Sequence, residues 1–449
     1  SDSSAVAVEA LWVLTNYAAN ASENVQVLID SDTVPLFVRL LESPHQDVMR
    51  QAAWVIGNVS GDGICGRDAV LSAGAIPVLV RCVYKSLDLS APPSVAVGML
   101  RLLMWVLRNL CAGQPDLDVG EIIATVAAVV QATDDIEVLV NLCWCLANIC
   151  DDLAPEAVIA SPTVCGHLVN LLGHLSATVV QPALRAVGNI VADDRPELTD
   201  AVVAAGATHR LTKLLGHYDR DIQRKACWAL SNLAAGTESQ LSAVLSCGCL
   251  PTVLALVNDL PDLNNATEEA CWVVLNATTG ATLEQAEVLV DAGCVPLLCR
   301  MLPLKTVLAL PALEALERVL AFGDQLVAME EEPRNPFVDA VDADAVRGVA
   351  ASNAKARALA DAYFAVCGLC RQVFTQDSAG AALCEACKCA VCASCDCSQY
   401  HMAAQEAVWA EDIGPEPPSA TSTTSSSKQA RRSRRKQARR RKARQAKAA

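Results

Sequence analysis

Residues 226–236 read ACWALSNLAAG, and residues 52–62 read AAWVIGNVSGD. In both stretches a tryptophan is followed four residues later by an asparagine, inside a mostly apolar run. The same pair recurs as Trp12 and Asn16, Trp54 and Asn58, Trp105 and Asn109, Trp144 and Asn148, Trp228 and Asn232, and Trp272 and Asn276. Asn189 continues the series, with Arg185 in the place of the tryptophan. The chain therefore contains an internal repeat.

The spacing of this repeat indicates its architecture. Successive members lie 42, 51, 39, 41, 43 and 44 residues apart, and armadillo or HEAT units of two or three helices have a period of about 40–47 residues. The one long interval contains residues 85–94, which we interpret as an inserted loop. A degenerate further unit is predicted at residues 311–324, where Glu314 and Arg318 replace the tryptophan and the asparagine.

Each unit is predicted to contain a short helix, a helix that starts with proline, and a longer Trp/Asn helix. The prolines expected at the first helical position, where a missing N–H forfeits no hydrogen bond, are Pro77, Pro251 and Pro296. Such units bury their apolar faces only against their neighbours. Residues 1–325 are therefore predicted to form one all-α armadillo solenoid, a right-handed superhelix of about eight units whose first unit is truncated.

Composition supports a helical protein with an uneven charge. Of 449 residues, 53% are apolar and 4% aromatic, which excludes a wholly disordered chain and disfavours a β-rich one. No apolar run reaches the roughly 18 residues of a membrane span, and no secretory leader is recognisable. The chain opens with Ser rather than Met, which is compatible with a missing start. Residues 428–449 hold 12 Lys or Arg and no acid, so the net charge of −15 corresponds to −27 for residues 1–427. An acidic body repels nucleic acid and attracts cationic partners.

The Trp/Asn pairs have a structural and a functional interpretation. Residues four apart share one helix face, and a core tryptophan with a turn-capping asparagine would explain any single pair. Repetition favours a surface ladder, because asparagine is a poor helix former and its buried amide needs partners. Asn amides could hold the backbone of an extended peptide, and slots between neighbouring indoles could hold the stems of Lys or Arg, with a cation–π attraction of about 0.5–2 kcal/mol each. Carboxylates expected at the slot mouths are Asp62, Asp193, Asp194 and Glu269.

At these residues the sequence resembles a known family. The stretches AAWVIGNVSGD (52–62), ALRAVGNIVADD (183–194), ACWALSNLAAG (226–236) and EACWVVLNATTG (269–280) look like importin α (karyopherin α), and the likeness covers roughly residues 8–325. The resemblance implies a nuclear import adaptor of the cytoplasm and nucleus. It would bind basic nuclear localisation signals of cargo and pass them to an importin β-type carrier, without a cofactor.

The resemblance also implies two peptide-binding sites. The major site would comprise Trp12, Asn16, Gln51, Trp54, Asn58, Asp62, Trp105, Asn109, Trp144 and Asn148. The minor site would comprise Arg185, Asn189, Asp194, Trp228, Asn232, Glu269, Trp272 and Asn276. Within the major site, Asp62 would bind the key lysine of the signal.

Three features depart from the family. Asn20 and Val25 stand where the family has glycine and threonine near the lysine pocket, and Asn141 stands where it often has an acid before Trp144. Because valine has no hydroxyl to donate, we expect a weakened pocket. The N-terminal basic segment that binds importin β in this family is absent, so we expect either a truncated chain or a different mode of carrier docking.

A cysteine-rich segment follows the repeats. The cysteines of residues 1–366 are scattered and are predicted to be buried thiols of an intracellular protein, whereas residues 367–401 contain closely spaced CxxC pairs. The candidate zinc ligands are Cys367, Cys370, Cys384, Cys387, Cys389, Cys392, Cys395, Cys397 and His401. Such knuckles favour structural Zn²⁺, with redox or disulfide roles and the absence of an ordered site as alternatives.

The remaining segments are predicted to be accessory. We expect a helical extension or linker at residues 326–366, a flexible linker at 402–427 and a disordered basic tail at 428–449. The tail is interpreted as a ligand that binds the Trp/Asn surface of the same chain. The alternatives are a solvated disordered tail and a contact with nucleic acid.

Three functions are compatible with these features. The favoured one is the import adaptor. The others are a generic armadillo interaction scaffold with a zinc-binding C-terminal module, and a zinc-containing ubiquitin ligase. No nucleophile–base set, phosphate loop or RING spacing supports an enzyme, so none is expected.

Overall fold

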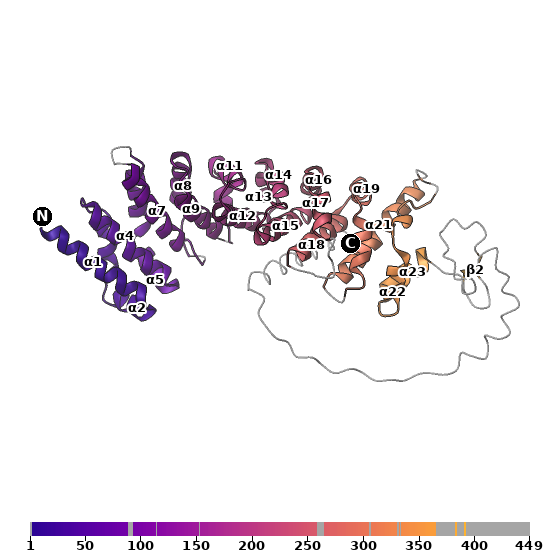
Figure 1. Ribbon diagram of the computed structural model, residues 1–449, viewed down its shortest axis with the longest axis horizontal. Coiled ribbons are helices and arrows are strands. Elements are labelled where there is room, and N and C mark those ends of the chain that lie inside the picture. The colour runs from indigo at the N-terminus through magenta and orange to yellow at the C-terminus, as the bar shows by residue number, and fades with distance from the viewer. Residues whose placement is uncertain are drawn as a thin grey trace, which may run out of the picture. The chain divides into compact units, whose positions relative to one another are not determined.

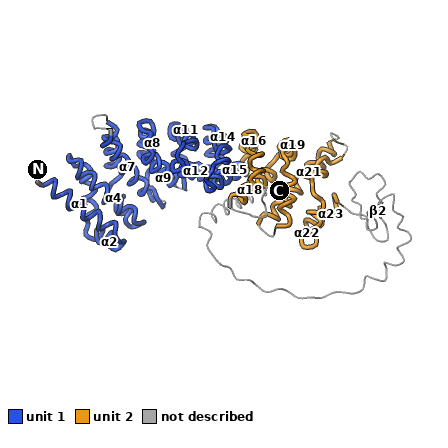
Figure 2. Tube along the Cα trace, viewed as in Figure 1, with its two compact units in different colours: residues 1–233 blue, residues 234–449 orange. Residues whose placement is uncertain are grey.

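The computed structural model describes residues 2–88, 93–113, 115–151, 153–257, 265–304, 307–329, 332, 334–364, 382–383 and 390–391. The chain divides into two compact units, unit 1 (residues 1–233) and unit 2 (residues 234–449), as Figure 2 shows. Helices make up nearly all the regular structure of the described residues, as the repeat predicted. Each unit is described by itself.

Unit 1 repeats a first, a middle and a long helix (Figure 1). The long Trp/Asn helices are α1 (Asp2–Asn20), α4 (Gln46–Gly61), α7 (Pro93–Leu110), α9 (Ile136–Ile149), α12 (Ala177–Val191) and α15 (Arg220–Ala234). The middle helices are α3 (Val34–Leu40), α6 (Ala75–Leu87), α8 (Gly120–Ala132), α11 (Pro162–Leu171) and α14 (Ala207–Leu214). The short first helices are α2 (Ser22–Asp30), α5 (Ile64–Ser72), α10 (Pro155–Ile159) and α13 (Pro196–Ala204).

Helices of one kind pack on their own kind in unit 1. Among the long helices, α1 packs on α4, α4 on α7, α7 on α9 and α9 on α12. Among the middle helices, α3 packs on α6, α6 on α8, α8 on α11 and α11 on α14. From α1 to α12 the long helices therefore form one continuous layer, which places their equivalent residues in rows.

Glycine turns separate the first and middle helices. Gly74 and Gly206 adopt left-handed backbone angles, with φ of 75° and 89°, which only glycine adopts without strain. The middle helix begins at the next residue, so Pro77 is the third residue of α6 rather than the first, as we had expected. Pro251 is likewise the second residue of α17 and Pro296 the third of α20. The correction is small, because the N–H groups of the whole first turn have no partner within the helix.

The core between the layers is apolar. Phe37, Leu103, Leu107 and Leu142 are essentially inaccessible to solvent. The cysteines of residues 1–366 are free thiols, and all but Cys65 and Cys247 are buried, which largely confirms their prediction as small core residues. No single described helix is long and apolar enough to cross a membrane.

Unit 2 continues the helical pattern. Its helices are α16 (Glu238–Ser246), α17 (Leu250–Leu256), α18 (Asn265–Gly280), α19 (Leu283–Asp291), α20 (Cys294–Met301), α21 (Ala309–Ala328), the 3₁₀ helix η2 (Val338–Ala340), α22 (Ala343–Ala350) and α23 (Ala354–Tyr363). Glu314 and Arg318 lie in α21, the degenerate long helix. The strands β1 (Ala382–Leu383) and β2 (Ala390–Val391) pair antiparallel, a detail absent from the all-α prediction.

A buried asparagine joins the last helices of unit 2. Asn335 is 3% exposed, and its amide donates to the Leu320 carbonyl and to Asp324, both at 2.8 Å. Its oxygen accepts the Phe337 N–H at 3.0 Å, and Tyr363 donates to the other carboxylate oxygen of Asp324. Asn335 and Tyr363 thereby tie the segment around η2 and the end of α23 to α21.

Candidate peptide-binding surface

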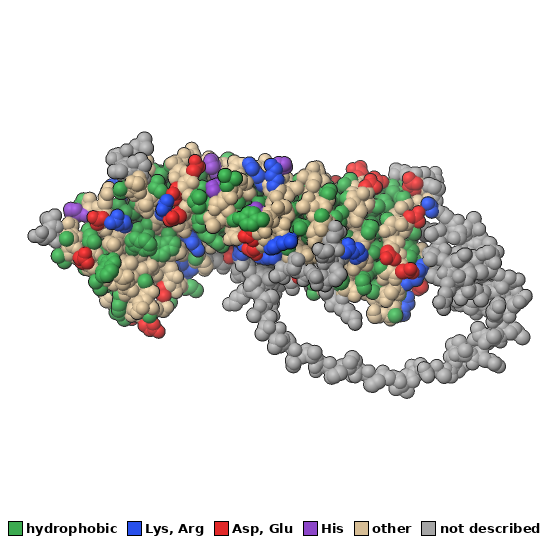
Figure 3. Space-filling view, in the orientation of Figure 1, with side chains coloured by type: hydrophobic (Ala, Val, Ile, Leu, Met, Phe, Trp, Pro, Cys, Tyr) green, Lys and Arg blue, Asp and Glu red, His purple; other side chains and the backbone are tan. Residues whose placement is uncertain are grey.

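The six repeated tryptophans lie at the surface or at its edge. Trp12 is 55% exposed and Trp54 44% exposed, and Trp105, Trp144, Trp228 and Trp272 are half-buried. Figure 3 shows hydrophobic side chains gathered over α4 and α7, with charged side chains beside them. None of the six is a buried core residue, so the surface interpretation of the tryptophans holds.

The asparagines tie neighbouring long helices together. The Asn58 amide donates to the Thr15 carbonyl at 2.9 Å, and the Asn109 amide to the Gly57 carbonyl at 3.1 Å. The same bond joins Asn148 to the Arg108 carbonyl and Asn189 to the Ala147 carbonyl, both at 3.0 Å. In each case the acceptor directly precedes the asparagine of the previous long helix.

This tie was not anticipated from the sequence, which assigned the amides to a ligand. A carboxamide has two N–H donors and one oxygen, and the tie uses one donor. The rest of each amide keeps the capacity to bind a peptide backbone. Asn16 differs, because its amide donates to the Trp12 carbonyl of its own helix at 2.9 Å.

Burial of the asparagines increases along unit 1. Asn16 is exposed and Asn58, Asn109 and Asn148 are half-buried, whereas Asn189 and Asn232 are buried, at 9% and 4% exposure. The Asn232 amide nitrogen has no hydrogen-bond partner among the described residues. The predicted surface ladder therefore applies to the earlier asparagines and not to Asn189 and Asn232.

The indoles lie on the preceding long helix. A Cβ atom added to Gly57 would come within 1.9 Å of Cζ3 of Trp105, and one added to Gly188 within 2.2 Å of Cζ3 of Trp228. Each ring therefore covers the glycine that precedes the asparagine of the helix before. The Trp/Asn pair of α7 thus holds Gly57 twice, by ring packing and by the amide tie to its carbonyl.

The expected open slots between neighbouring indoles are only partly present. The Trp54 and Trp105 ring centroids lie 5.5 Å apart, with the planes tilted by 54°. This is direct aromatic contact, so the expected slot is closed at this pair. At the next position the Arg108 guanidinium carbon lies 5.4 Å from the centre of the Trp144 ring. A side chain of the protein itself therefore covers that ring.

Asp62 is available at the start of the surface. It directly follows α4 and is exposed, and its Oδ1 accepts a hydrogen bond of 2.7 Å from the Ser22 hydroxyl. Val25, at the position where we expected a missing hydroxyl to matter, is 2% exposed and belongs to the core. Ser22 thus places a hydroxyl beside the carboxylate. Gln51 lies on α4 one turn before Trp54 and is half-buried.

A hollow of about 1000 Å³ adjoins Trp54 and Trp105. Its charged and amide residues are Gln46, Arg50, Lys85, Arg101, Glu137 and Asn141. Arg50 pairs with Asp47 at 2.6 Å, and Arg101 pairs with Glu137 at 3.1 Å. The hollow is therefore not the strongly acidic slot that the overall charge suggested.

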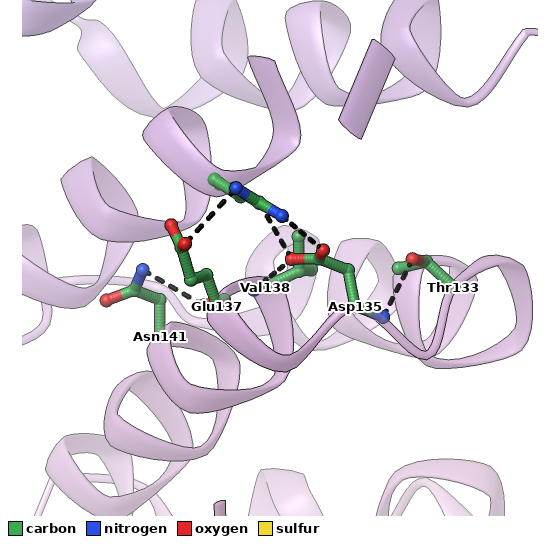
Figure 4. Close-up of polar contacts among 6 residues, drawn as sticks. Thr133, Asp135, Glu137, Val138 and Asn141 are labelled. Atoms are coloured by element: carbon green, nitrogen blue, oxygen red, sulfur yellow. Dashed lines mark hydrogen bonds and ion pairs between the residues drawn. The ribbon is translucent and has the colours of Figure 1, made fainter. Parts of the chain in front are cut away.

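Arg101 joins α7 to the start of α9. Its guanidinium binds both carboxylate oxygens of Asp135, at 2.9 and 2.7 Å. Figure 4 shows Asp135 also accepting the Val138 N–H, with Glu137 and Asn141 further along α9. The hydrogen bond from Arg101 holds the pKa of Asp135 below its usual value. The carboxylates of Asp135 and Glu137, at the start of α9, are therefore both paired with Arg101.

The residues of the predicted minor site are divided between the two units. In unit 1, burial lowers the pKa of Arg185, Asp194 is exposed, and Lys225, three residues before Trp228, pairs with Asp221 at 2.6 Å. In unit 2, Glu269, Trp272 and Asn276 are half-buried on α18. The unit 1 part carries more cations than the sequence interpretation assumed.

The predicted zinc ligands lie outside the described residues, as does the basic tail. Within the part of the chain that the structure describes, no group of three or more His, Cys, Asp or Glu side chains is arranged to hold a metal ion. The Cys145 thiol donates a hydrogen bond to the Cys111 sulfur, 3.6 Å away in the core, and this hydrogen bond together with burial raises the pKa of Cys111.

Comparison with known proteins shows which families and proteins this chain is similar to. The family model described as Armadillo/beta-catenin-like repeat matches residues 21–61 and 195–235. The chain is 35% identical over 341 residues to importin subunit alpha-1b of Oryza sativa subsp. japonica, covering 74% of this chain and 61% of that protein. It is 38% identical over 323 residues to importin subunit alpha-4 of Arabidopsis thaliana, covering 70% of this chain and 58% of that protein.

The chain thus spans less than two thirds of the length of these two relatives. Among solved structures, a crystal structure of an engineered protein matches with a TM-score of 0.54 at 23% identity, covering 79% of this chain and 93% of that one. At this identity the structural likeness shows the fold alone.

Proposed function

The chain belongs to the importin α family of armadillo-repeat proteins, and from that premise we propose that it is a nuclear import adaptor. In this proposal it binds Lys/Arg-rich localisation signals of cargo on the Trp/Asn surface and passes them to an importin β-type carrier. It would act in the cytoplasm and nucleus, by binding rather than by catalysis.

The observation that carries the proposal is the surface formed by α1 and α4. Two exposed indoles, Trp12 and Trp54, lie in equivalent places on packed neighbouring helices. Asp62, exposed and bonded to Ser22, supplies a carboxylate at the end of α4. An apolar ring face for an alkyl stem and an anion for its charged head are what a lysine side chain needs.

The major site is expected to be centred on Trp12, Trp54 and Asp62. The closed Trp54–Trp105 contact and the coverage of Trp144 by Arg108 leave the first indole pair as the most accessible one. The second site is expected to be weaker, because the guanidinium of Arg185, in the place of a tryptophan, would repel a cationic peptide.

Transport itself requires no cofactor in this proposal. Structural Zn²⁺ in residues 367–401 stays a prediction from the CxxC spacing.

The direct test is a binding titration of the full chain. A fluorescent peptide rich in Lys and Arg and a Glu-rich peptide of equal length are titrated at the same salt concentration, with anisotropy as the readout. The proposal expects saturable binding of the basic peptide only. Preference for the Glu-rich peptide would instead support the generic scaffold and contradict the import adaptor.

A further inference from the structure

Arg108 lies on a tryptophan that belongs to the predicted cargo site. It is on α7, three residues after Trp105, and its guanidinium carbon lies 5.4 Å from the centre of the Trp144 ring on α9. This distance is within the roughly 6 Å at which a guanidinium is attracted to an indole face. The contact is the one that a lysine or arginine of a bound peptide would otherwise make.

The other surroundings of Arg108 hold it in this place. Its Nη1 donates a long hydrogen bond, 3.4 Å, to Oδ1 of Asn141, one turn before Trp144. Among the described residues no ion pair joins Arg108 to a carboxylate, although the side chain is half-buried. Burial lowers its pKa. The Trp144 ring face and the Asn141 amide oxygen therefore stabilise the positive charge of Arg108, which no carboxylate of the described residues pairs.

The neighbouring charges do not favour a second cation there. Glu137 is the acid that lines the adjoining hollow, and it already pairs with Arg101. Asn141, in the place where an acid was expected, carries no charge. Near Trp105 and Trp144 the surface therefore presents Arg101 and Arg108, and the carboxylates of Asp135 and Glu137 are both bonded to Arg101.

We propose that Arg108 occupies the Trp144 face in place of a cargo side chain and thereby makes this stretch of the groove select a neutral or acidic residue beside the basic cluster. The inference rests on the proposed function. The signal class that it specifies is a short Lys/Arg cluster, bound near Trp12, Trp54 and Asp62, followed in the groove by an acidic residue.

The test exchanges charge on both partners. A fluorescent basic peptide is scanned with single Lys→Ala and Lys→Glu replacements, and each peptide is titrated against the wild type and the variants Arg108→Gln and Arg108→Lys. Arg39→Gln, an exposed arginine on α3, is the matched control. Circular dichroism checks that each variant is folded.

In the wild type, one peptide position is expected to accept Glu with equal or higher affinity than Lys. Arg108→Gln should reverse this order at that position alone, by about threefold to tenfold, and Arg108→Lys should behave as the wild type. Identical scans for the wild type and Arg108→Gln would overturn the inference while leaving the proposed function intact. Absence of binding of any basic peptide to the wild type would overturn both.

Discussion

A single amide joins each of the long helices α4, α7, α9 and α12 to the long helix before it. We expect Asn109→Ala to lower the free energy of unfolding by about 0.5–1.5 kcal/mol, the value of one neutral hydrogen bond, because the tie to Gly57 is lost. The matched control is Asn16→Ala, whose amide bonds within its own helix. Urea denaturation measures both, and an equal loss in the two variants would contradict a tie between helices.

The Trp105 ring lies against Gly57 and leaves no room for a side chain there. In Gly57→Ala the new methyl group would collide with Trp105, and we expect overpacking to lower the free energy of unfolding by about 1–3 kcal/mol. Gly98→Ala is the control, since its Cβ would meet nothing within 4 Å, and alanine should stabilise α7 by about 0.5–1 kcal/mol. Thermal and urea unfolding should therefore show Gly57→Ala less stable and Gly98→Ala more stable than the wild type. Equal shifts of the same sign in the two variants would show that Trp105 does not cover Gly57.

At the scale of elements, Arg101 and Asp135 connect α7 to the N-terminus of α9. Asp135→Asn keeps a residue that can cap the helix but removes the ion pair, and should lower the free energy of unfolding at pH 7 by about 0.5–1 kcal/mol. Because Arg101 lowers the pKa of Asp135 in the folded state, the wild type's advantage is complete above the ordinary carboxyl pKa of about 4. This stability advantage is lost as the pH falls through the lowered pKa of Asp135.

Urea unfolding of both proteins between pH 7 and pH 3 measures that difference. Convergence of the two stabilities at the acidic end is expected. A difference that stays constant over the whole range would show that the ion pair does not account for it.

The repeat predicted these elements well. The four-residue spacing within each Trp/Asn pair indicates one face of a helix, and the spacing of about 40 residues between pairs indicates the length of a unit. The glycine–proline turns were recognised for the same reason, with the helix starts displaced by one or two residues. The amide ties were missed because their acceptors are main-chain carbonyls, which have no sequence signature. Ser22, Arg101 and Arg108 were missed because each occurs once, outside the repeated pattern, and acts on a residue of another helix.

At the scale of the whole molecule, charge is segregated along the sequence. Residues 428–449 carry 12 Lys or Arg, against a net −27 for residues 1–427. If the tail is a cis ligand of the groove, its deletion should raise the affinity for a basic peptide severalfold, by about threefold or more at low salt, and less at high salt. Anisotropy titrations of the full chain and of a chain ending at residue 427 measure this, and equal affinities would remove the cis-ligand hypothesis.

The central claim is that the surface at Trp12, Trp54 and Asp62 binds cationic peptides. Its most direct test is the affinity of one fluorescent basic peptide for the wild type, Asp62→Lys, Glu269→Lys and the control Glu287→Lys, which reverses an exposed charge on α19. We predict that Asp62→Lys weakens binding by about tenfold or more, as expected for loss of a hydrogen bond to a charged group, that Glu269→Lys weakens it less, and that Glu287→Lys leaves it nearly unchanged. An unchanged affinity in Asp62→Lys would contradict the account.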